Sequence, residues 1–437
     1  MTDNILKIID VYKKFYDNIV VHISSSKSKN IQLNGLETES IDYASDTTVY
    51  LRAVKEGRQI SCGFSGVDVE AIEAFLNIYE TAIMKLPSDE NRFIPDYTAI
   101  DGDLKLVDNV YNEIYMKDLI DIATKVTESA IKHDDRVTAV KQATASASIK
   151  ELSIISSAGP ILKRQKTLFS AGAYAIASDG TEDRDGYDYV SSTSLAKLPY
   201  NSTGIFAAEN ACSLLSARHI NTDQYHIMFS ADVMADFVEL LLDLVDADSV
   251  YKGVSMLGDK LGQSVASSIF TLIDDPLMYG GAGSILFDYE GQACAPIEII
   301  KDGQLKSFLH NSYTAKALGM PNNARAVLSG GGNIGIGCSN VILASTGTLS
   351  DSCPEYLKVT EVMGMHTADP VSGDFSVGIS GMYYKDGKPA YPFKEAALSG
   401  NLADLLKGLL NVSDNKRTFG NITTADALFD KMTVSGV

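Results

Sequence analysis

The sequence has no long apolar run and few cysteines, and both absences limit what the chain can be. It contains no stretch of about 18 uncharged apolar residues, so no membrane-spanning helix is predicted. Its start, Met1-Thr-Asp-Asn-Ile-Leu-Lys, lacks the basic and apolar segments of a secretory signal. We therefore expect a cytoplasmic protein that does not interact with membranes.

The cysteines are odd in number, widely scattered and never arranged as C-x-x-C. They are Cys62, Cys212, Cys294, Cys338 and Cys353. A disulfide framework needs paired cysteines and a zinc ribbon needs closely spaced ones, so this pattern favours buried, reduced thiols.

The chain is also poor in positive charge. It has 37 Lys and Arg against 56 Asp and Glu, which gives a net charge of −19. Binding to a phosphate backbone requires a concentrated basic surface, so direct binding to nucleic acid is not expected. The densest basic run, Lys163-Arg164-Gln-Lys166, is short, and we interpret it as a solvated strand edge.

Local catalytic motifs are missing as well. The nucleophile pattern G-x-S-x-G does not occur. A zincin-type helix places a glutamate directly after its first histidine. The residues that follow the six histidines are Ile23, Asp134, Ile220, Ile227, Asn311 and Thr367. The closest pair, His219 and His226, is separated by seven residues across a predicted turn, so the sequence predicts no local metal site.

Two further segments match known motifs in residue pattern but lack the structural context that those motifs require. Gly330-x-Gly332-x-x-Gly335 fits the dinucleotide fingerprint, but the residues after it are glycine-rich and β-prone, whereas that fingerprint requires a helix. The acidic run Asp179-Gly-Thr-Glu-Asp-Arg-Asp-Gly186 resembles a calcium loop, yet the aligned last position is Ser192 and not a bidentate glutamate. We interpret them as a flexible loop and a solvated turn.

The chain does contain the length and patterning of a two-domain α+β protein. Its 437 residues are 45% hydrophobic and 21% charged, as in ordinary globular proteins. Strands predominate in meanders and helices come in separate blocks, which favours antiparallel or mixed sheets with packed helices. We place an N-terminal domain at residues 1–198 and a C-terminal domain at residues 199–437, with a linker at 199–204 and a helix at about 205–217 opening the second.

Periodicity indicates the individual elements. Apolar residues at helical spacing predict helices at about 4–15, 67–84, 116–131 and 232–244. Short strands with glycine turns are predicted between residues 137 and 178, and further strands at 47–54, 58–64, 225–229, 268–273, 295–300 and 357–363. Two Asp-Gly dipeptides, within 300–305 and 384–389, predict tight hairpins.

Several ordered blocks resemble the TldD/PmbA family, once called modulators of DNA gyrase. The blocks are Phe287-Asp-Tyr-Glu-Gly291, Ile299-Ile-Lys-Asp-Gly-Gln-Leu305, Ser312-Tyr-Thr-Ala-Lys-Ala-Leu-Gly319, Val362-Met-Gly-Met-His-Thr-Ala-Asp-Pro-Val-Ser-Gly-Asp-Phe-Ser376, Tyr391-Pro392, Leu398-Ser-Gly-Asn-Leu402 and Met432-Thr-Val-Ser-Gly436. They cover roughly the last 150 residues in family order, and a looser match covers the rest.

The resemblance implies a TldE/PmbA-type subunit without catalytic residues. In this family the TldD-type subunit binds zinc through an H-E-x-x-x-H helix and a downstream cysteine. By register, the corresponding helix here is 232–244, which contains no histidine. Asn421-Ile-Thr-Thr-Ala425 falls where a family cysteine often lies, and threonine occupies that position. The resemblance thus implies a heteromeric zinc metallopeptidase for unfolded peptides, with zinc only in a TldD-like partner.

Two other functions stay open from the sequence. One is a stand-alone homodimer that binds peptides as a scaffold without protease activity. The other is an active peptidase whose distant histidines converge in the fold. The substrate, the partner and the choice between homodimer and heterodimer are all left open.

Two glycine-containing segments are our candidates for the wall of a peptide cleft. The candidate residues are Gly330, Gly331, Gly332, Gly373, Asp374, Phe375, Ser376 and Gly378. We expect these segments to accept an extended peptide by strand addition, which satisfies backbone groups without selecting side chains. The alternative is that both segments are plain tight loops.

Overall fold

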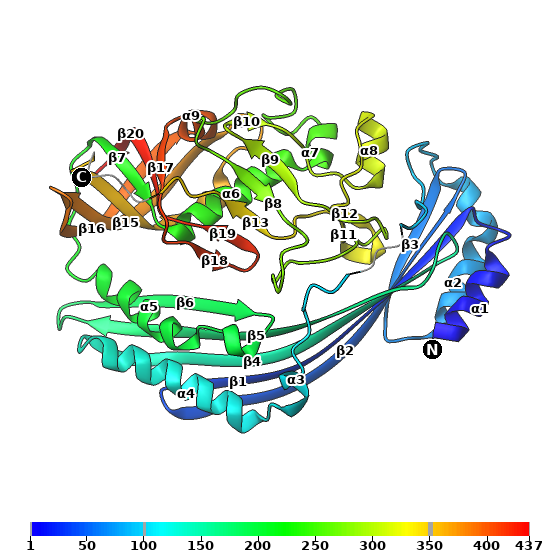
Figure 1. Ribbon diagram of the computed structural model, residues 1–437, viewed down its shortest axis with the longest axis horizontal. Helices are drawn as coiled ribbons and strands as arrows, with labels where there is room; N and C mark the ends of the chain where they lie inside the picture. Colours follow the sequence, from blue (N-terminus) through cyan, green and yellow to red (C-terminus); the bar gives the residue numbers. More distant parts are fainter. Residues whose placement is uncertain (1, 99–101, 348–352, 437) are drawn as a thin grey trace.

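The computed structural model describes residues 2–98, 102–347 and 353–436, and its fold is α+β, as predicted. Helices cover the outer face of a long curved sheet, and the C-terminal part of the chain lies against the inner face (Figure 1). Within the described ranges, no helix has the length and apolar character needed to cross a membrane.

The curved sheet has six strands, and every neighbouring pair is antiparallel. In spatial order they are β3 (Arg58–Ser65), β2 (Glu37–Lys55), β1 (Asn18–Asn34), β4 (Val137–Ser156), β5 (Leu162–Ser178) and β6 (Asp183–Ser192). The sequence predicted short strands between residues 137 and 178, but β4 and β5 have 20 and 17 residues. They are this long because the helices α4 and α5 cover one face of these strands and the C-terminal part of the chain covers the other.

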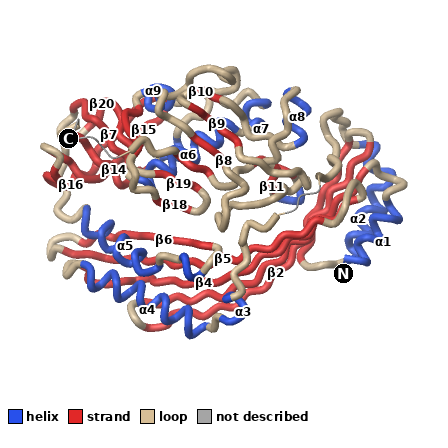
Figure 2. The backbone as a smooth tube through the Cα atoms, in the orientation of Figure 1, coloured by secondary structure: helices blue, strands red, loops and turns tan. Residues whose placement is uncertain are grey.

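Alternation along the strands separates the two faces of this sheet. Ile19 and Val21 of β1 pack with α1 (Thr2–Tyr12) and α2 (Val69–Ala82), whereas Val20 packs with Phe287 of the C-terminal part. The remaining helices of the outer face are α3 (Val110–Glu113), α4 (Met116–His133) and α5 (Tyr200–Ser213). Figure 2 shows the helices at both ends of the sheet on its outer side.

Helix α5 packs on the first sheet, although the sequence analysis made this region open the second domain. Ala207, Ala208 and Ala211 are fully buried in one core with α4 and β5. The contact is close, because a Cβ on Gly204 would lie 2.1 Å from the carbonyl oxygen of Val126. We therefore propose that the boundary between the two parts lies after α5 and not at 198/199.

A closed, mixed sheet forms one half of the C-terminal part. Its strands are β16 (Lys388–Asn401), β15 (Asp374–Lys385), β14 (Tyr356–Met363), β7 (Asp223–Phe229), β20 (Ala427–Ser435) and β17 (Leu409–Val412). β14 and β7 are parallel, and pairing of β16 with β20 closes the sheet. The barrel brings the last strand of the chain beside the first strand of this part.

A second mixed sheet lies beside the barrel. Its strands are β10 (Gln304–Leu305), β9 (Ile297–Lys301), β8 (Leu272–Asp274), β13 (Val341–Leu343), β19 (Ile422–Thr424) and β18 (Arg417–Phe419). The strand predicted at 268–273 is shorter, because Ser267 and Phe270 close a turn through a 2.9 Å backbone hydrogen bond. Both Asp-Gly hairpins are confirmed, with Asp302, Gly303, Asp386 and Gly387 at positive φ.

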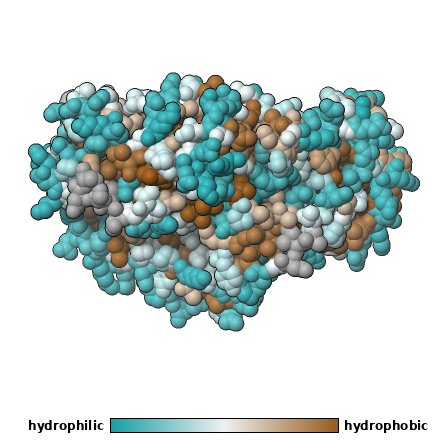
Figure 3. Space-filling view, turned by 45° about the horizontal axis from the view of Figure 1, so that its top comes forward, coloured by the Kyte–Doolittle hydropathy of each residue, from teal (hydrophilic) through white to brown (hydrophobic). Residues whose placement is uncertain are grey.

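The remaining elements are short. They are α7 (Ala247–Tyr251), α8 (Ser312–Leu318), α9 (Leu402–Lys407), β11 (Ala326–Leu328), β12 (Ile334–Ile336) and the 3₁₀ turns η1 (Ile83–Lys85), η2 (Leu195–Lys197), η3 (Gly330–Gly332) and η4 (Met365–Thr367). Hydrophilic side chains cover most of the face shown in Figure 3, and apolar side chains gather in patches along its middle.

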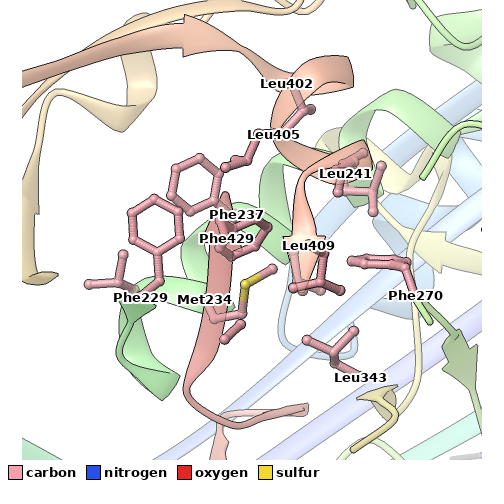
Figure 4. Packing of buried hydrophobic residues seen from close by; sticks show 14 of the residues in the cluster. Phe229, Met234, Phe237, Leu241, Phe270, Leu343, Leu402, Leu405, Leu409 and Phe429 are labelled. Carbon is pink, nitrogen blue, oxygen red and sulfur yellow. The ribbon is translucent and has the colours of Figure 1, made fainter. Parts of the chain in front are cut away.

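Helix α6 (Ala231–Val245) is the central element of the C-terminal core, as its apolar stripe predicted. Phe237 lies with its ring centroid 4.6 Å from that of Phe229 and 5.7 Å from that of Phe375. Figure 4 shows Met234, Phe237 and Leu241 among the leucines and phenylalanines of the surrounding strands and of α9. This packing fixes which face of α6 remains available for other contacts.

Candidate functional site

The N-terminus of α6 is held by the segment that joins β19 to β20. Asp426 accepts a 3.0 Å hydrogen bond from the backbone N–H of Ala231 and pairs with Lys358 at 2.7 Å. The hydroxyl of Thr424, which is fully buried, donates to the carbonyl oxygen of Ala231 at 2.5 Å. Two segments nearly 200 residues apart therefore meet at the first turn of this helix.

The face of α6 that does not enter the core carries carboxylates. Asp232, Asp236, Glu239 and Asp243 recur at three- and four-residue intervals along it. Burial, together with the neighbouring Glu239 and Asp232, raises the pKa of Asp236 to about 6. Asp236 therefore takes up a proton more readily than an ordinary aspartate.

Residues of the curved sheet face the acidic side of α6. Asp188 of β6 is buried and pairs with Arg417 of β18 at 2.5 Å, and the guanidinium of Arg417 lies 4.1 Å from the ring centroid of Phe206. Burial raises the pKa of Asp188 even though Arg417 opposes the change, and Asp232 raises it further. The ion pair joins the curved sheet to the C-terminal part directly beside α6.

The first candidate cleft segment, Gly330 to Gly332, packs against the curved sheet. A Cβ on Gly332, which has φ +82°, would lie 3.2 Å from the carbonyl oxygen of Cys62. The segment forms the tip of the β11–β12 hairpin, and β12 pairs with β11 alone in the described sheets. β12 also borders a cavity of about 500 Å³. These glycines thus lie beside an edge strand that borders a cavity, and the amide of Asn311 contacts the carbonyl oxygen of Gly335 at 3.4 Å on that strand.

That cavity contains a buried ion pair. Arg52 of β2 and Glu290 lie 3.2 Å apart and are almost fully enclosed. The second oxygen of Glu290 accepts a 2.8 Å hydrogen bond from the backbone N–H of Ser312, whereas Nε of Arg52 is buried without a partner in the described structure. The pair joins the curved sheet to the C-terminal part at the end opposite Arg417.

The second candidate segment, residues 373–378, lies elsewhere. It begins β15 in the barrel, where Asp374 pairs with Asn401 of β16 at the start of α9. Phe375 is only 4% exposed and packs on Phe237, and the backbone of Gly373 is bonded to Asp369 and Leu402. The fold therefore does not bring the two candidate segments together, and their role in peptide binding stays a prediction.

The basic run is not a solvated strand edge, contrary to the sequence analysis. β5 is an interior strand, between β4 and β6. Arg164 donates to the carbonyl oxygen of Phe287 at 2.7 Å, and the ammonium of Lys166 donates to the carbonyl oxygen of Ala282. Both side chains point to the C-terminal part because even-numbered residues of β5 lie on the inner face.

Comparison with known proteins identifies the family. The family model described as PmbA/TldA metallopeptidase central domain matches residues 111–215, and the one described as PmbA/TldA metallopeptidase C-terminal domain matches residues 222–436. The chain belongs to the PmbA/TldD family. A relative named metalloprotease PmbA homolog, from Haemophilus influenzae, is 28% identical, over 92% of this chain and 88% of its own length. Metalloprotease PmbA of Escherichia coli O157:H7 is 24% identical, over 96% and 92%.

Solved structures share the whole fold. A protein of Thermotoga maritima described as a modulator of DNA gyrase superposes with a TM-score of 0.89, 22% identity and 99% coverage of both chains. TldE of Thermococcus kodakarensis gives a TM-score of 0.88 with 18% identity, covering 99% of this chain and all of its own. The PmbA/TldD fold therefore extends over the full chain, including the curved sheet.

The metal that the family name implies does not fit the residues around α6. Zinc sites in proteins use mainly imidazole and thiolate donors. The exposed face of α6 offers only carboxylates, and the hydroxyl of Thr424 is already engaged with Ala231. In the described part of the chain, no three His, Cys, Asp or Glu side chains are grouped so as to hold a metal ion.

The histidines and thiols lie away from this helix face. His22 and His310 are buried, and burial lowers the pKa of each to about 4. The thiol of Cys338 accepts a 3.4 Å contact from the amide of Asn421, and burial raises its pKa to about 11. Cys212 and Cys294 are buried as expected, whereas the other three cysteines are only half-buried.

Sequence patterns could not have revealed the two ion pairs that join the parts. Arg417 and Asp188 are separated by 229 residues, and Arg52 and Glu290 by 238. Neither pair forms a motif, because the spacing along the chain carries no information about pairing across the fold. The one local signal was Glu290 itself, which lies inside the family block 287–291.

Proposed function

We propose that this chain is the non-catalytic, TldE-type subunit of a heteromeric cytoplasmic zinc metallopeptidase that degrades or matures unfolded peptides. The observation that carries the proposal is the first turn of α6. The resemblance expects a thiolate within residues 421–425 and two imidazoles on this helix, whereas Thr424 offers a hydroxyl and the exposed helix face offers carboxylates. The metal and its activated water then belong to a TldD-type partner with an H-E-x-x-x-H helix.

Two observations support this assignment. Relatives that match nearly the full length are named metalloprotease PmbA, which ties the family to proteolysis. Hydrolysis of a peptide bond at neutral pH without a covalent nucleophile needs a way to form hydroxide, and a bound metal lowers the pKa of water from 15.7 to about 7. A chain without donors of the right kind would depend on its partner for this step.

The test is a three-way degradation assay with an unstructured peptide. We expect this chain alone to leave the peptide intact over hours, and the mixture with a TldD-type chain to degrade it and to lose activity with a chelator. The essential-subunit proposal fails when the TldD-type chain cleaves equally well alone. Cleavage by this chain alone, in the presence of chelator, would exclude the metallopeptidase assignment altogether. A stable homodimer that binds peptide but never supports cleavage would favour a scaffold protein.

We further propose that unfolded peptide contacts the β12 edge beside Gly330, Gly331 and Gly332. Ile334 to Ile336 form an edge strand that borders the 500 Å³ cavity, so a peptide strand has room to pair there. Photo-crosslinking of an unstructured peptide to the assembled complex should label this hairpin more strongly than residues 373–378, whose backbone is largely paired. Labelling confined to residues before 150 would reject a cleft at either segment.

A further inference from the structure

A second cavity, of about 480 Å³, lies between the inner face of the curved sheet and the C-terminal part. Lys150 of β4 and Arg164 and Lys166 of β5 border it from the sheet. Leu152, Leu168, Ile285 and Val327 add apolar walls, and Tyr189 and Tyr289 add aromatic ones. We call it the β4–β5 cavity.

The three cations concentrate positive charge in an otherwise acidic protein. Lys150 and Lys166 are direct cross-strand partners, an arrangement that is destabilising when both side chains carry the same charge. Arg164 and Lys166 donate to the carbonyl oxygens of Phe287 and Ala282, and Arg164 also lies 4.4 Å from the ring centroid of Tyr289. In the described part of the chain neither cation forms an ion pair with a carboxylate. Burial, together with repulsion from Arg164 and Lys150, lowers the pKa of Lys166 to about 8.

The carboxylate of Glu151 does not neutralise the positive charge of this cavity. Glu151 borders the cavity, but its side chain accepts a 2.5 Å hydrogen bond from Gln165, and both side chains belong to the outer face of the sheet. An anion placed between Lys150, Arg164 and Lys166 would remove the repulsion. The volume and the apolar walls fit a carboxylate attached to an organic chain better than a bare ion.

We propose that the β4–β5 cavity binds carboxylate groups of acidic peptides, through Lys150, Arg164 and Lys166. This inference rests on the proposed function in peptide handling and adds to it a preference for peptides rich in Asp and Glu. No bond is made or broken at this site.

The experiment compares two labelled, unstructured peptides, rich in Gly and Ser, that differ only in carrying Glu or Gln. Fluorescence anisotropy with the full chain should show about fivefold tighter binding of the Glu peptide at low salt. Added salt should remove that difference, because it screens charges that are partly exposed. Equal affinity for the two peptides would overturn the carboxylate site and leave the proposed function intact.

Variants of exposed lysines assign the preference to this cavity. Lys150→Gln should abolish the fivefold preference, and Lys150→Arg should retain it because the charge is kept. Lys27→Gln is the matched control, since Lys27 is exposed on the neighbouring strand β1 but on the outer face. An equal loss in Lys27→Gln, or no loss in Lys150→Gln, would overturn the assignment, as would failure of both peptides to bind. Failure of the degradation assay with a retained Glu preference would instead reject the proposed function alone.

Discussion

Phe237 shows how one side chain of α6 supports the core of the C-terminal part. It is 2% exposed and touches both Phe229 and Phe375. Phe237→Ala should lower the free energy of unfolding by about 3–5 kcal/mol, because it removes buried apolar contacts and leaves a cavity. Urea unfolding measures this loss. Glu239→Ala, on the exposed face of the same helix, is the control and should change stability by less than about 0.5 kcal/mol.

His22 makes stability depend on pH in acid. It is 1% exposed, its Nε2 lies 2.7 Å from the carbonyl oxygen of Tyr289, and burial lowers its pKa to about 4. In the unfolded chain a histidine titrates near 6.5, so between about pH 4 and 6.5 the unfolded state binds more protons. The stabilisation, up to about 3 kcal/mol, is complete above pH 6.5 and is lost as the pH falls to 4.

The variant His22→Gln tests this dependence. It keeps a donor for Tyr289 but cannot titrate, so its free energy of unfolding should fall less steeply than that of the wild type between pH 6.5 and 4. Some dependence remains, because burial also lowers the pKa of His310 to about 4. Measurement at pH 8 separates the packing effect from the ionisation effect. Parallel curves for the two proteins across this range would contradict the prediction.

At the scale of elements, α6 decides whether the chain can hold a metal. Its exposed face carries carboxylates, and Thr424 at its first turn donates its hydroxyl to a backbone carbonyl. We expect the isolated chain to bind no stoichiometric zinc, iron or nickel after mild dialysis, as measured by elemental analysis. A TldD-type chain treated in the same way should retain its metal and serves as the control. About one tightly bound metal per chain would disprove this prediction.

Element prediction succeeded where local pattern is sufficient. The helix predicted at 232–244 became α6 at Ala231–Val245, because its apolar residues recur at helical spacing and all fill one core. The strand predicted at 268–273 was wrong over most of its length, since a turn at Ser267–Phe270 outweighs the β-propensity of those residues. β4 and β5 were predicted as short strands but are long. The layers that cover their two faces are distant in sequence, so no local pattern reveals the full length of these strands.

At the scale of the whole molecule, buried ion pairs join the curved sheet to the C-terminal part. Glu290→Gln leaves Arg52 charged and enclosed, so we expect a loss of about 3–5 kcal/mol in the free energy of unfolding. Lys132→Gln, which breaks the exposed pair with Glu128, is the control and should cost less than about 1 kcal/mol. Chemical unfolding measures both. Equal losses in the free energy of unfolding for the two variants would show that the buried pair contributes no more to stability than the exposed pair.

The sequence by itself determined several of the elements and the family. Apolar spacing predicts α6, Asp-Gly dipeptides predict the two hairpins, and ordered blocks such as 287–291 carry the family resemblance, because each signal lies within a few neighbouring residues. The absence of histidine from α6 is likewise a fact of the sequence, although its meaning depends on where that helix lies.

Only the tertiary structure decided which distant residues meet. It placed Thr424 at the first turn of α6, 193 residues away, and Arg164 and Lys166 inside a cavity instead of in solvent. It also separated the two candidate cleft segments, since one caps a hairpin against the curved sheet and the other lies in the barrel. Local patterns cannot determine such contacts, because they depend on how layers pack and on which face each strand presents.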